Sequence, residues 1–547
     1  MMMTILCGKV PLAQLPTLSV VVLSLLIIQN FTTRCEANLK LPTFVASHMV
    51  LQREPLSSRI WGWADPGSLV RVSLDSKIYT DTNAQPDGSW IIELPPQPAG
   101  SDHKILIADG ETSITLQDVA FGDVYLCSGQ SNMELSLPAV FNASAEIEDS
   151  SNYPNLRLAT VDKVTSDTPQ KDAPSKSPDY AWARSGPDAM NLNDTFKYYS
   201  ATCYFFGREL YKALDSEIPI GLVTSCWGGQ TVETFSSPDA LADKSCGGTR
   251  PVHGTDGGGG RNGTTVVTSG PGPRPTQLWN AMIHPLVNMR FAGSVWYQGE
   301  SNAFDPESYA CRFPAMIRDW RLKFGLSDLS FFFVQLAGFH GTKDDWPGLR
   351  AAQMAATQLP RVGYAAAIDL GDPSSPSSAI HPRRKLEVGR RLSLSARTIQ
   401  YGERGGLVST GPILAGVQQL PTFSTTHTIR LSFSPGTADG LHVHGSPECS
   451  LCCEKLPFRV LDANGTWSRV DGAEVRDSEI DLSSNVGPVF GVRYAWELYP
   501  ECLVYNGEGG PDDHAGIAGA PWEWCSEPSG DPAWTGTACK VPASAKG

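Results

Sequence analysis

A serine that follows a β-prone run is placed where nucleophilic chemistry is favourable. Residues 124–127 are β-prone, Gly129 permits a turn, and Met133 and Leu135 begin a new apolar pattern beyond Ser131. The spacing predicts a buried strand, a glycine turn and a helix start, with the Ser131 hydroxyl at the carboxyl edge of a sheet. Unpaired N–H groups in the first turn of a helix stabilise an oxyanion. The alternative is an ordinary N-cap serine, which occupies the same kind of turn.

Two further strand ends offer side chains that fit the same chemistry. The apolar run 294–297 ends at Gln298, and the apolar run 365–370 precedes His381 and Pro382. A serine, a carboxamide and a histidine supply a nucleophile, an oxyanion donor and a base for acyl transfer. Open α/β sheets place ligands at such an edge. For His381 the alternative is a structural histidine at a helix entry, before a proline in the first helical position.

Five sequence blocks, in order along the chain, are similar to those of the sialate O-acetylesterase branch of the SGNH hydrolases. The blocks are SGQSNM (128–133), CWGG (226–229), LWNAMIHP (278–285), WYQGESN (296–302) and IHP (380–382). The likeness extends from about Leu39 to Asn506. The resemblance implies an α/β catalytic domain with an SGNH-hydrolase-like, flavodoxin-like parallel sheet.

The resemblance also implies roles for individual residues. Ser131 is expected to be the nucleophile and His381 the general base. Gly229, through its backbone N–H, and Gln298, through its side-chain amide, are expected to form the oxyanion hole beside the N–H of Ser131. Glu300 is interpreted as a supporting residue, because acyl transfer needs no second carboxylic acid.

The position of the usual triad acid departs from the family pattern. SGNH enzymes usually have Asp three residues before the histidine, and this chain has Ser378 there. Either Asp372 folds back to His381, or a backbone carbonyl orients the imidazole. The sequence favours a Ser-His dyad, because an acceptor on the second ring nitrogen is enough to set the tautomer. The basic residues 383–385 could attract a substrate carboxylate, but they are interpreted as a solvated helix face.

The expected activity is that of a serine esterase that hydrolyses O-acetyl esters of sialic acids through an acetyl-serine intermediate. One alternative is an acetylesterase of another carbohydrate, such as acetylated xylan. The other is a non-catalytic carbohydrate-binding protein, which would require loss of Ser131, Gln298 or His381. The expected partner is an O-acetylated sialic acid or another acetylated carbohydrate. Neither a metal nor an organic cofactor is expected.

Composition and charge describe a globular protein. Of 547 residues, 41% are hydrophobic and 18% are charged. A net charge of −14 argues against binding nucleic acid. The same charge repels an anionic sugar at long range, so any attraction for such a substrate must be local.

The chain begins with features of a secreted protein. The apolar run 18–28 is shorter than a membrane span, so residues 1–37 are predicted to be a cleaved signal peptide that leaves no transmembrane segment. Sequons support entry into the secretory pathway, with a lysosomal or extracellular destination. These sequons begin at Asn142, Asn193, Asn262 and Asn464.

Thirteen cysteines suggest disulfide bonds and one free thiol. Two of the cysteines lie in or near the leader, which leaves an odd number, and Cys127 is expected to be free because it lies in a buried strand. Six cysteines in the last hundred residues predict a disulfide cluster. A zinc site that combines some of them with His442 and His444 is the alternative. The six are Cys449, Cys452, Cys453, Cys502, Cys525 and Cys539.

The order of short β-prone runs and helical patterns predicts an α/β core between two antiparallel β domains. The expected boundaries are 38–118 for the N-terminal β domain, 119–404 for the catalytic domain, and 405–547 for the C-terminal β domain with its Cys-rich tail. A Gly-rich loop is expected at 245–275. The N-terminal tryptophans are interpreted as core residues, with stacking on sugar rings as the alternative.

Overall fold

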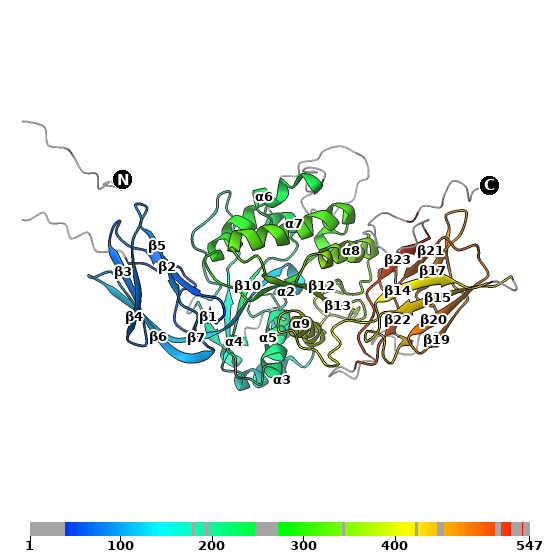
Figure 1. The fold of residues 1–547 in the computed structure, drawn as a ribbon, viewed down its shortest axis with the longest axis horizontal. Coiled ribbons are helices and arrows are strands. Elements are labelled where there is room, and N and C mark those ends of the chain that lie inside the picture. Colours follow the sequence, from blue (N-terminus) through cyan, green and yellow to red (C-terminus); the bar gives the residue numbers. More distant parts are fainter. Residues whose placement is uncertain are drawn as a thin grey trace, which may run out of the picture.

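The computed structural model describes most of the chain as three parts in a row, an α/β unit between two β-rich units (Figure 1). The described residues are 39–177, 181–190, 195–196, 198–246, 272–341, 345–421, 425–445, 453–508, 516–526 and 539. The predicted signal peptide and most of the predicted Gly-rich loop lie outside these ranges. A search of the described helices finds none with the length and apolar character needed to cross a bilayer.

The central unit is built on a parallel sheet. Its strands are β7 (Ser113–Gly129), β8 (Leu156–Thr160), β10 (Ile220–Cys226), β11 (Gly293–Tyr297), β12 (Ser330–Gln335) and β13 (Val362–Ala366), with β9 (Ala183–Arg184) antiparallel at one edge. The spatial order is β13-β12-β11-β7-β10-β8-β9. Strands β10, β7, β11, β12 and β13 thus reproduce the flavodoxin-like order, with β7 where the order reverses. The predicted fold class is confirmed.

Helices cover both faces of this sheet, which explains why its strands are apolar on both sides. Helices α5 and α9 pack together on one face, and α7 and α8 pack together on the other (Figure 1). The helices are α2 (Ser131–Glu134), α3 (Ala143–Asp149), α4 (Pro187–Met190), α5 (Ala201–Ala213), α6 (Pro238–Leu241), α7 (Pro306–Phe324), α8 (Trp346–Gln353) and α9 (Lys385–Ile399).

The N-terminal β unit shares strand β7 with the central sheet. Residues 113–121 of β7 pair with β6, and residues 123–129 pair with β10. The predicted boundary between residues 118 and 119 therefore lies inside one continuous strand. Trp61 and Trp90 are 5% and 3% exposed, which confirms that they are core residues. The other strands are β1 (Val50–Gln52), β2 (Ser58–Trp63), β3 (Leu69–Leu74), β4 (Lys77–Asn83), β5 (Ser89–Leu94) and β6 (Gly100–Ala108).

The C-terminal β unit has a hydrophobic core of its own. One sheet contains β14 (Leu414–Gln419), β15 (His427–Phe433), β20 (Glu479–Ser484) and β19 (Gly472–Arg476), and a second contains β18 (Trp467–Arg469), β17 (Phe458–Leu461), β21 (Gly491–Tyr494) and β23 (Trp522–Cys525). A separate pair is formed by β16 (His442–Gly445) and β22 (Cys502–Tyr505).

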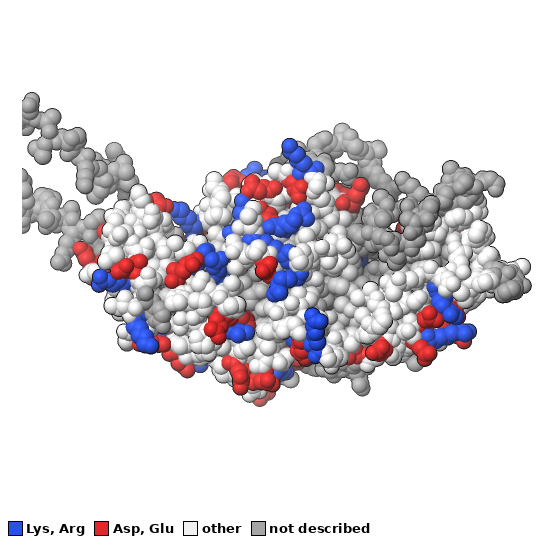
Figure 2. Space-filling model, viewed as in Figure 1, with Lys and Arg blue, Asp and Glu red and all other residues white. Residues whose placement is uncertain are grey.

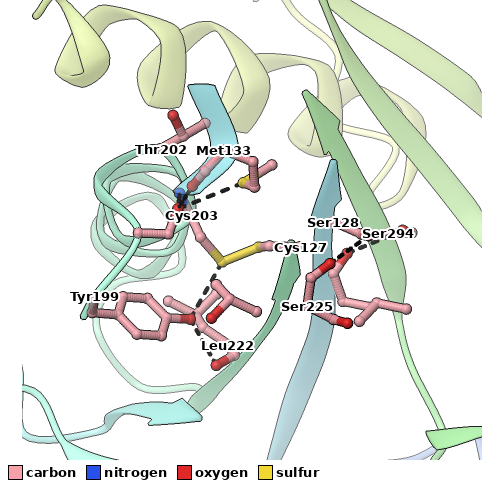
Figure 3. The surroundings of a disulfide bond; sticks show 12 residues. Cys127, Ser128, Met133, Tyr199, Thr202, Cys203, Leu222, Ser225 and Ser294 are labelled. Carbon is pink, nitrogen blue, oxygen red and sulfur yellow. Dashed lines mark hydrogen bonds between the residues drawn. A yellow bond between two sulfur atoms is a disulfide. The ribbon is translucent and has the colours of Figure 1, made fainter. Parts of the chain in front are cut away.

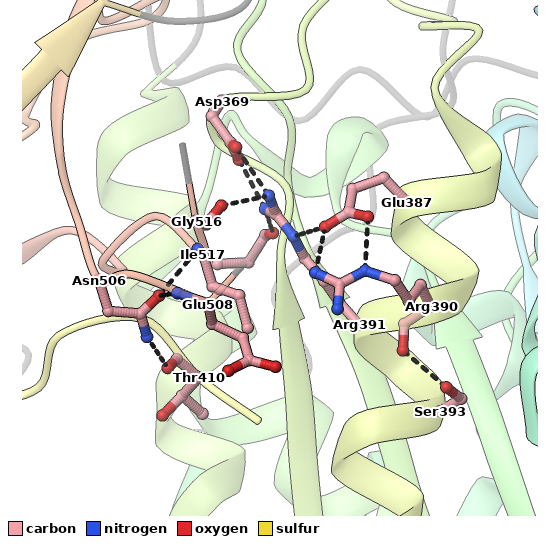
Figure 4. Close-up of polar contacts among 11 residues, drawn as sticks. Asp369, Glu387, Arg390, Arg391, Ser393, Thr410, Asn506, Glu508, Gly516 and Ile517 are labelled. Atoms are coloured by element: carbon pink, nitrogen blue, oxygen red, sulfur yellow. Dashed lines mark hydrogen bonds and ion pairs between the residues drawn. The ribbon is translucent and has the colours of Figure 1, made fainter. Parts of the chain in front are cut away.

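Buried polar contacts join the C-terminal unit to the central one. Arg391 on α9 contacts both Asp369 carboxylate oxygens, at 2.7 and 2.8 Å, and donates to Glu387 at 2.7 Å (Figure 4). It also donates to the carbonyl of Gly516 in the C-terminal unit. Arg350 on α8 reaches the same unit, through the carbonyl oxygens of residues 497 and 498.

Disulfide bonds correct one prediction and confirm another. Cys127 is not free: it is bonded to Cys203 on α5, 76 residues away (Figure 3). Within the described ranges the free thiol is that of buried Cys226. The predicted C-terminal disulfides are confirmed for the four described cysteines of that cluster, which are therefore unavailable as zinc thiolates. The remaining bonds are Cys246–Cys311, Cys453–Cys502 and Cys525–Cys539.

These disulfides indicate folding in the oxidising secretory pathway. Two predicted glycosylation positions, Asn142 and Asn464, are exposed on the surface. The sequons at Asn193 and Asn262 lie outside the described residues, as do Cys449 and Cys452.

Candidate active site

The turn after β7 requires glycine and brings Ser131 to the carboxyl edge of the sheet. Gly129 has φ +136°, and a Cβ at this position would lie 2.2 Å from the carbonyl oxygen of Tyr297 on β11. The next residue, Gln130, donates its N–H to that same carbonyl at 3.0 Å. Ser131 then begins α2. As the first residue of a helix it has a free N–H, which finds no acceptor among the described residues.

The structure brings Ser131 and His381 together. The Ser131 Oγ lies 2.8 Å from His381 Nε2, and His381 Nδ1 lies 2.6 Å from the carbonyl oxygen of Ser377. A carbonyl can only accept, so Nδ1 carries the proton and Nε2 is the acceptor for the serine hydroxyl. Burial lowers the pKa of His381, which favours this neutral imidazole. Phe196 packs edge-on against the ring at 5.2 Å.

The candidate for a triad acid, Asp372, does not contact His381. Asp372 is fully buried and accepts hydrogen bonds from Arg383 at 2.6 and 3.0 Å. Burial alone would raise the pKa of Asp372, but the bonds from Arg383 outweigh that effect and hold it below its usual range. Ser378 sits in the turn before the histidine with φ +85°. Of the two arrangements that the sequence left open, the structure contains the backbone carbonyl acceptor.

Gly229 lies beside Ser131, on the turn after β10. It has φ +75°, and its N–H has no acceptor within the described ranges. The neighbouring Gly228 donates its N–H to Glu134 Oε2 at 2.9 Å. A Cβ at Gly228 would approach the Cβ of Ser131 to 3.1 Å. The backbone of the CWGG block thus passes close to Ser131, and the free N–H of Gly229 lies next to the serine.

Gln298 occupies a different position from the one expected of a side-chain oxyanion donor. It is fully buried, and its Nε2 donates to the carbonyl of Gln230 at 3.1 Å and to Asn302 Oδ1 at 2.7 Å. Both amide hydrogens are therefore used within the protein. The contact with Gln230 holds the turn that carries Gly229.

Asn132 connects the turn that carries Ser131 to the buried side chain of Lys385. The Asn132 Nδ2 donates to Glu300 Oε1 at 2.6 Å and to the Ile380 carbonyl at 2.8 Å. Its Oδ1 accepts from Lys385 Nζ at 2.6 Å. Lys385 is fully buried, so its assignment to a solvated helix face was wrong.

The two arginines before that lysine are engaged as well. Arg383 binds Asp372, and the guanidinium groups of Arg383 and Arg384 lie 4.1 and 5.3 Å from the ring of Phe141. Burial lowers the pKa of Lys385 to about 7 and raises the pKa of Glu300. The sequence did not distinguish the buried Lys385 from the two arginines, because all three residues form one basic run.

The cleft above Ser131 has a volume of about 590 Å³. It is open to the surface and mixes polar groups with aromatic and aliphatic walls. The lining residues are Gln130, Ser131, Glu134, Lys163, Phe196, Gly228, Gly229, Glu300, Ser301, Phe304, Ile380 and His381.

Comparison with known proteins finds relatives over most of the chain. A family profile described as carbohydrate esterase, sialic acid-specific acetylesterase matches residues 121–395. The Mus musculus protein named sialate O-acetylesterase is 34% identical over 534 residues, covering 88% of this chain and 94% of that protein. The Homo sapiens protein of the same name is 33% identical, covering 85% and 89%. A crystal structure of a carbohydrate acetylesterase from Xanthomonas citri aligns with TM-score 0.72 and 29% identity, over 89% of this chain and 100% of that one.

Proposed function

Because the chain belongs to the family of sialic acid-specific acetylesterases, and is therefore an esterase of acetylated carbohydrates, we propose that it removes O-acetyl groups from sialic acids. The observation that carries this proposal is the line of contacts from the Ser131 hydroxyl through His381 to the Ser377 carbonyl. This line contains a nucleophile, a base in the correct tautomer and a group that fixes the base.

In the proposed reaction, Ser131 Oγ attacks the acetyl carbonyl carbon while His381 Nε2 accepts the serine proton. The bond to the sugar oxygen then breaks, and His381 returns the proton to the departing sugar hydroxyl. The product on the enzyme is acetyl-Ser131. Water deprotonated by His381 hydrolyses this ester, releasing acetate and restoring the serine.

The negative charge of each tetrahedral intermediate develops at the start of α2. The N–H groups of Ser131 and Gly229 are the proposed donors, supported by the positive end of the helix. Gln298 completes this region by holding the carbonyl of Gln230, which keeps the Gly229 turn in place. The Ser377 carbonyl holds the imidazole but stabilises an imidazolium less than a carboxylate would.

Replacing the serine tests the proposal. We expect Ser131→Ala to reduce acetate release from an O-acetylated sialic acid and from an aryl acetate to below ~1% of the parent rate, as for loss of the nucleophile in other serine hydrolases. Ser301→Ala, in the same cleft, should keep turnover within about tenfold of the parent. Turnover above ~1% in Ser131→Ala, with normal folding, would rule out the nucleophile assignment.

The rival substrate, acetylated xylan, requires the same chemistry at Ser131. Purified protein offered O-acetylated sialic acid and acetylated xylan side by side should release acetate faster from the sialic acid. Faster release from xylan would assign the chain to the other substrate. For location, we propose a lysosomal or extracellular enzyme, which fractionation of expressing cells and their medium would distinguish.

A further inference from the structure

We propose that Lys163, on the wall of the cleft, selects esters of anionic sugars by pairing with the sugar carboxylate. This inference rests on the proposed function of the cleft around Ser131. It assigns the choice between a sialic acid and a neutral sugar such as acetylated xylose to one side chain.

The first observation is a surplus of positive charge around Glu134. The Glu134 side chain is only 4% exposed, and its Oε1 lies 2.5 Å from Lys163 Nζ and 3.5 Å from Lys176 Nζ. Its Oε2 accepts the N–H of Gly228. Two ammonium groups thus share one carboxylate, which leaves a net charge of about +1 beside the nucleophile's helix.

The second observation is that, of the two lysines, Lys163 is the one that lines the cleft. Lys163 lines the cleft, and its side chain is 31% exposed. Lys176 is 16% exposed, does not line the cleft, and donates to the carbonyl of Phe196. A ligand in the cleft therefore meets Lys163. The indole of Trp227 lies 5.8 Å from Lys163 Nζ and stabilises the ammonium.

The other ionisable groups lining the cleft do not cancel this charge. Burial lowers the pKa of His381 and favours its neutral form, and the Ser377 carbonyl sets its tautomer. Glu300 is buried and accepts a hydrogen bond from Asn132, and burial raises its pKa, which favours its uncharged form. Lys163 is thus the cation that a ligand carboxylate reaches.

The chain as a whole provides no long-range attraction for an anion. Its net charge is −14, and acidic and basic side chains are interspersed over the face shown in Figure 2. Attraction must therefore come from a contact inside the cleft. Sialic acids carry a carboxylate that is ionised at neutral pH, whereas xylose residues do not, so an ammonium in the cleft discriminates between the two classes.

A matched pair of substrates tests this inference. The probes are an O-acetylated N-acetylneuraminic acid and its carboxyl methyl ester, which carry the same acetyl group but differ in charge. For Lys163→Gln we expect KM for the free acid to rise about tenfold or more at low salt, with kcat changed less than threefold. The methyl ester kinetics should stay within twofold of the parent. Lys163→Arg should recover most of the affinity for the free acid.

Lys171→Gln is the control, because Lys171 pairs with Asp87 away from this cleft, and it should behave as the parent. An equal loss on both esters would show that Lys163 only supports Glu134 and Gly228, and would overturn the inference. Unchanged kinetics on both esters would overturn it as well. Failure of the proposed function is a separate outcome, since it would be seen as activity retained by Ser131→Ala on either ester.

Discussion

Helix α9 carries two buried cations that lie less than two helical turns apart but in opposite electrostatic environments. Arg391, in the middle of the helix, binds the carboxylates of Asp369 and Glu387. Lys385, at the start of the helix, donates to the amide oxygen of Asn132, lies over the ring of Tyr297, and forms no ion pair with a carboxylate of the described residues. Burial lowers the pKa of both groups, but the two carboxylates outweigh it for Arg391, whose pKa is raised. The pKa of Lys385 falls to about 7.

The difference between Arg391 and Lys385 shows where the described part of the protein contains a buried cation without a carboxylate partner. The compensated cation joins two structural units, and the undercompensated one lies next to the residues that carry the proposed chemistry. Groups with perturbed pKa values gather at functional sites because catalysis constrains which partners are present. One helix thus stabilises a junction and supports a reactive cleft.

The largest expected effect comes from breaking the compensated pair. Arg391→Met should lower the free energy of unfolding by about 3–5 kcal/mol, because it removes the cation from the buried carboxylate of Asp369 and leaves Glu387 with Arg390 alone. Urea unfolding at neutral pH measures the change. Arg397→Met, which removes an exposed pair with Glu403, is the control and should cost less than ~1 kcal/mol. A comparable loss of unfolding free energy in both variants would show that burial of the Arg391 network adds nothing to its effect on stability.

A smaller effect, with a distinctive pH dependence, is expected at the other cation. The folded pKa of Lys385 is about 7 and the unfolded value is about 10.5. Between these values the unfolded chain binds more protons, so this lysine makes stability rise with pH. In Lys385→Met this contribution is absent, so the parent should gain about 2 kcal/mol of stability over the variant on going from pH 7 to pH 9. Urea unfolding measures the free energy at each pH. An equal change of this free energy with pH in the two proteins would contradict the prediction.

The smallest effect is expected at the ion pair between Asp372 and Arg383, which precedes the same helix. Asp372 binds Arg383 and does not contact His381, so Asp372→Asn should reduce turnover by less than about tenfold. Replacement of a triad aspartate by its amide costs ~10⁴-fold. Ser378→Ala should be nearly silent. A loss of several orders of magnitude in Asp372→Asn, in a normally folded protein, would establish a rearranged triad in solution.

Much of the fold could be predicted because it depends on local pattern. The β-prone runs at 58–63, 69–74 and 89–94 coincide with β2, β3 and β5, since alternating burial leaves a period-two signature. Strand β4 was missed, because the sequence KIYTDTN has little apolar alternation. The near-helical spacing of apolar residues over 195–214 predicts a helix across that range, but the helix begins only at Ala201, where Ser200 caps the first turn by accepting the N–H of Cys203.

The site was predictable where glycine and strand ends determine position, and not where long-range partners do. Gly129 marks the turn that places Ser131, and this was visible in the sequence. The partner of Cys127 was not, because Cys203 comes from a helix 76 residues away. Lys385 was misassigned for the same reason, since its partner Asn132 lies far away in the sequence. The two acceptors that engage Gln298 also depend on the folded turn.

The sharing of β7 between two sheets bears on the order in which the chain assembles during synthesis. Its first half pairs with β1 and β6, which precede it in the chain, whereas its neighbours β10 and β11 are translated about a hundred residues or more later. The N-terminal unit can therefore form on the ribosome and present the second half of β7 as a preformed template. The central strand of the catalytic sheet, with Ser131 at its end, is then in place before the rest of that sheet exists.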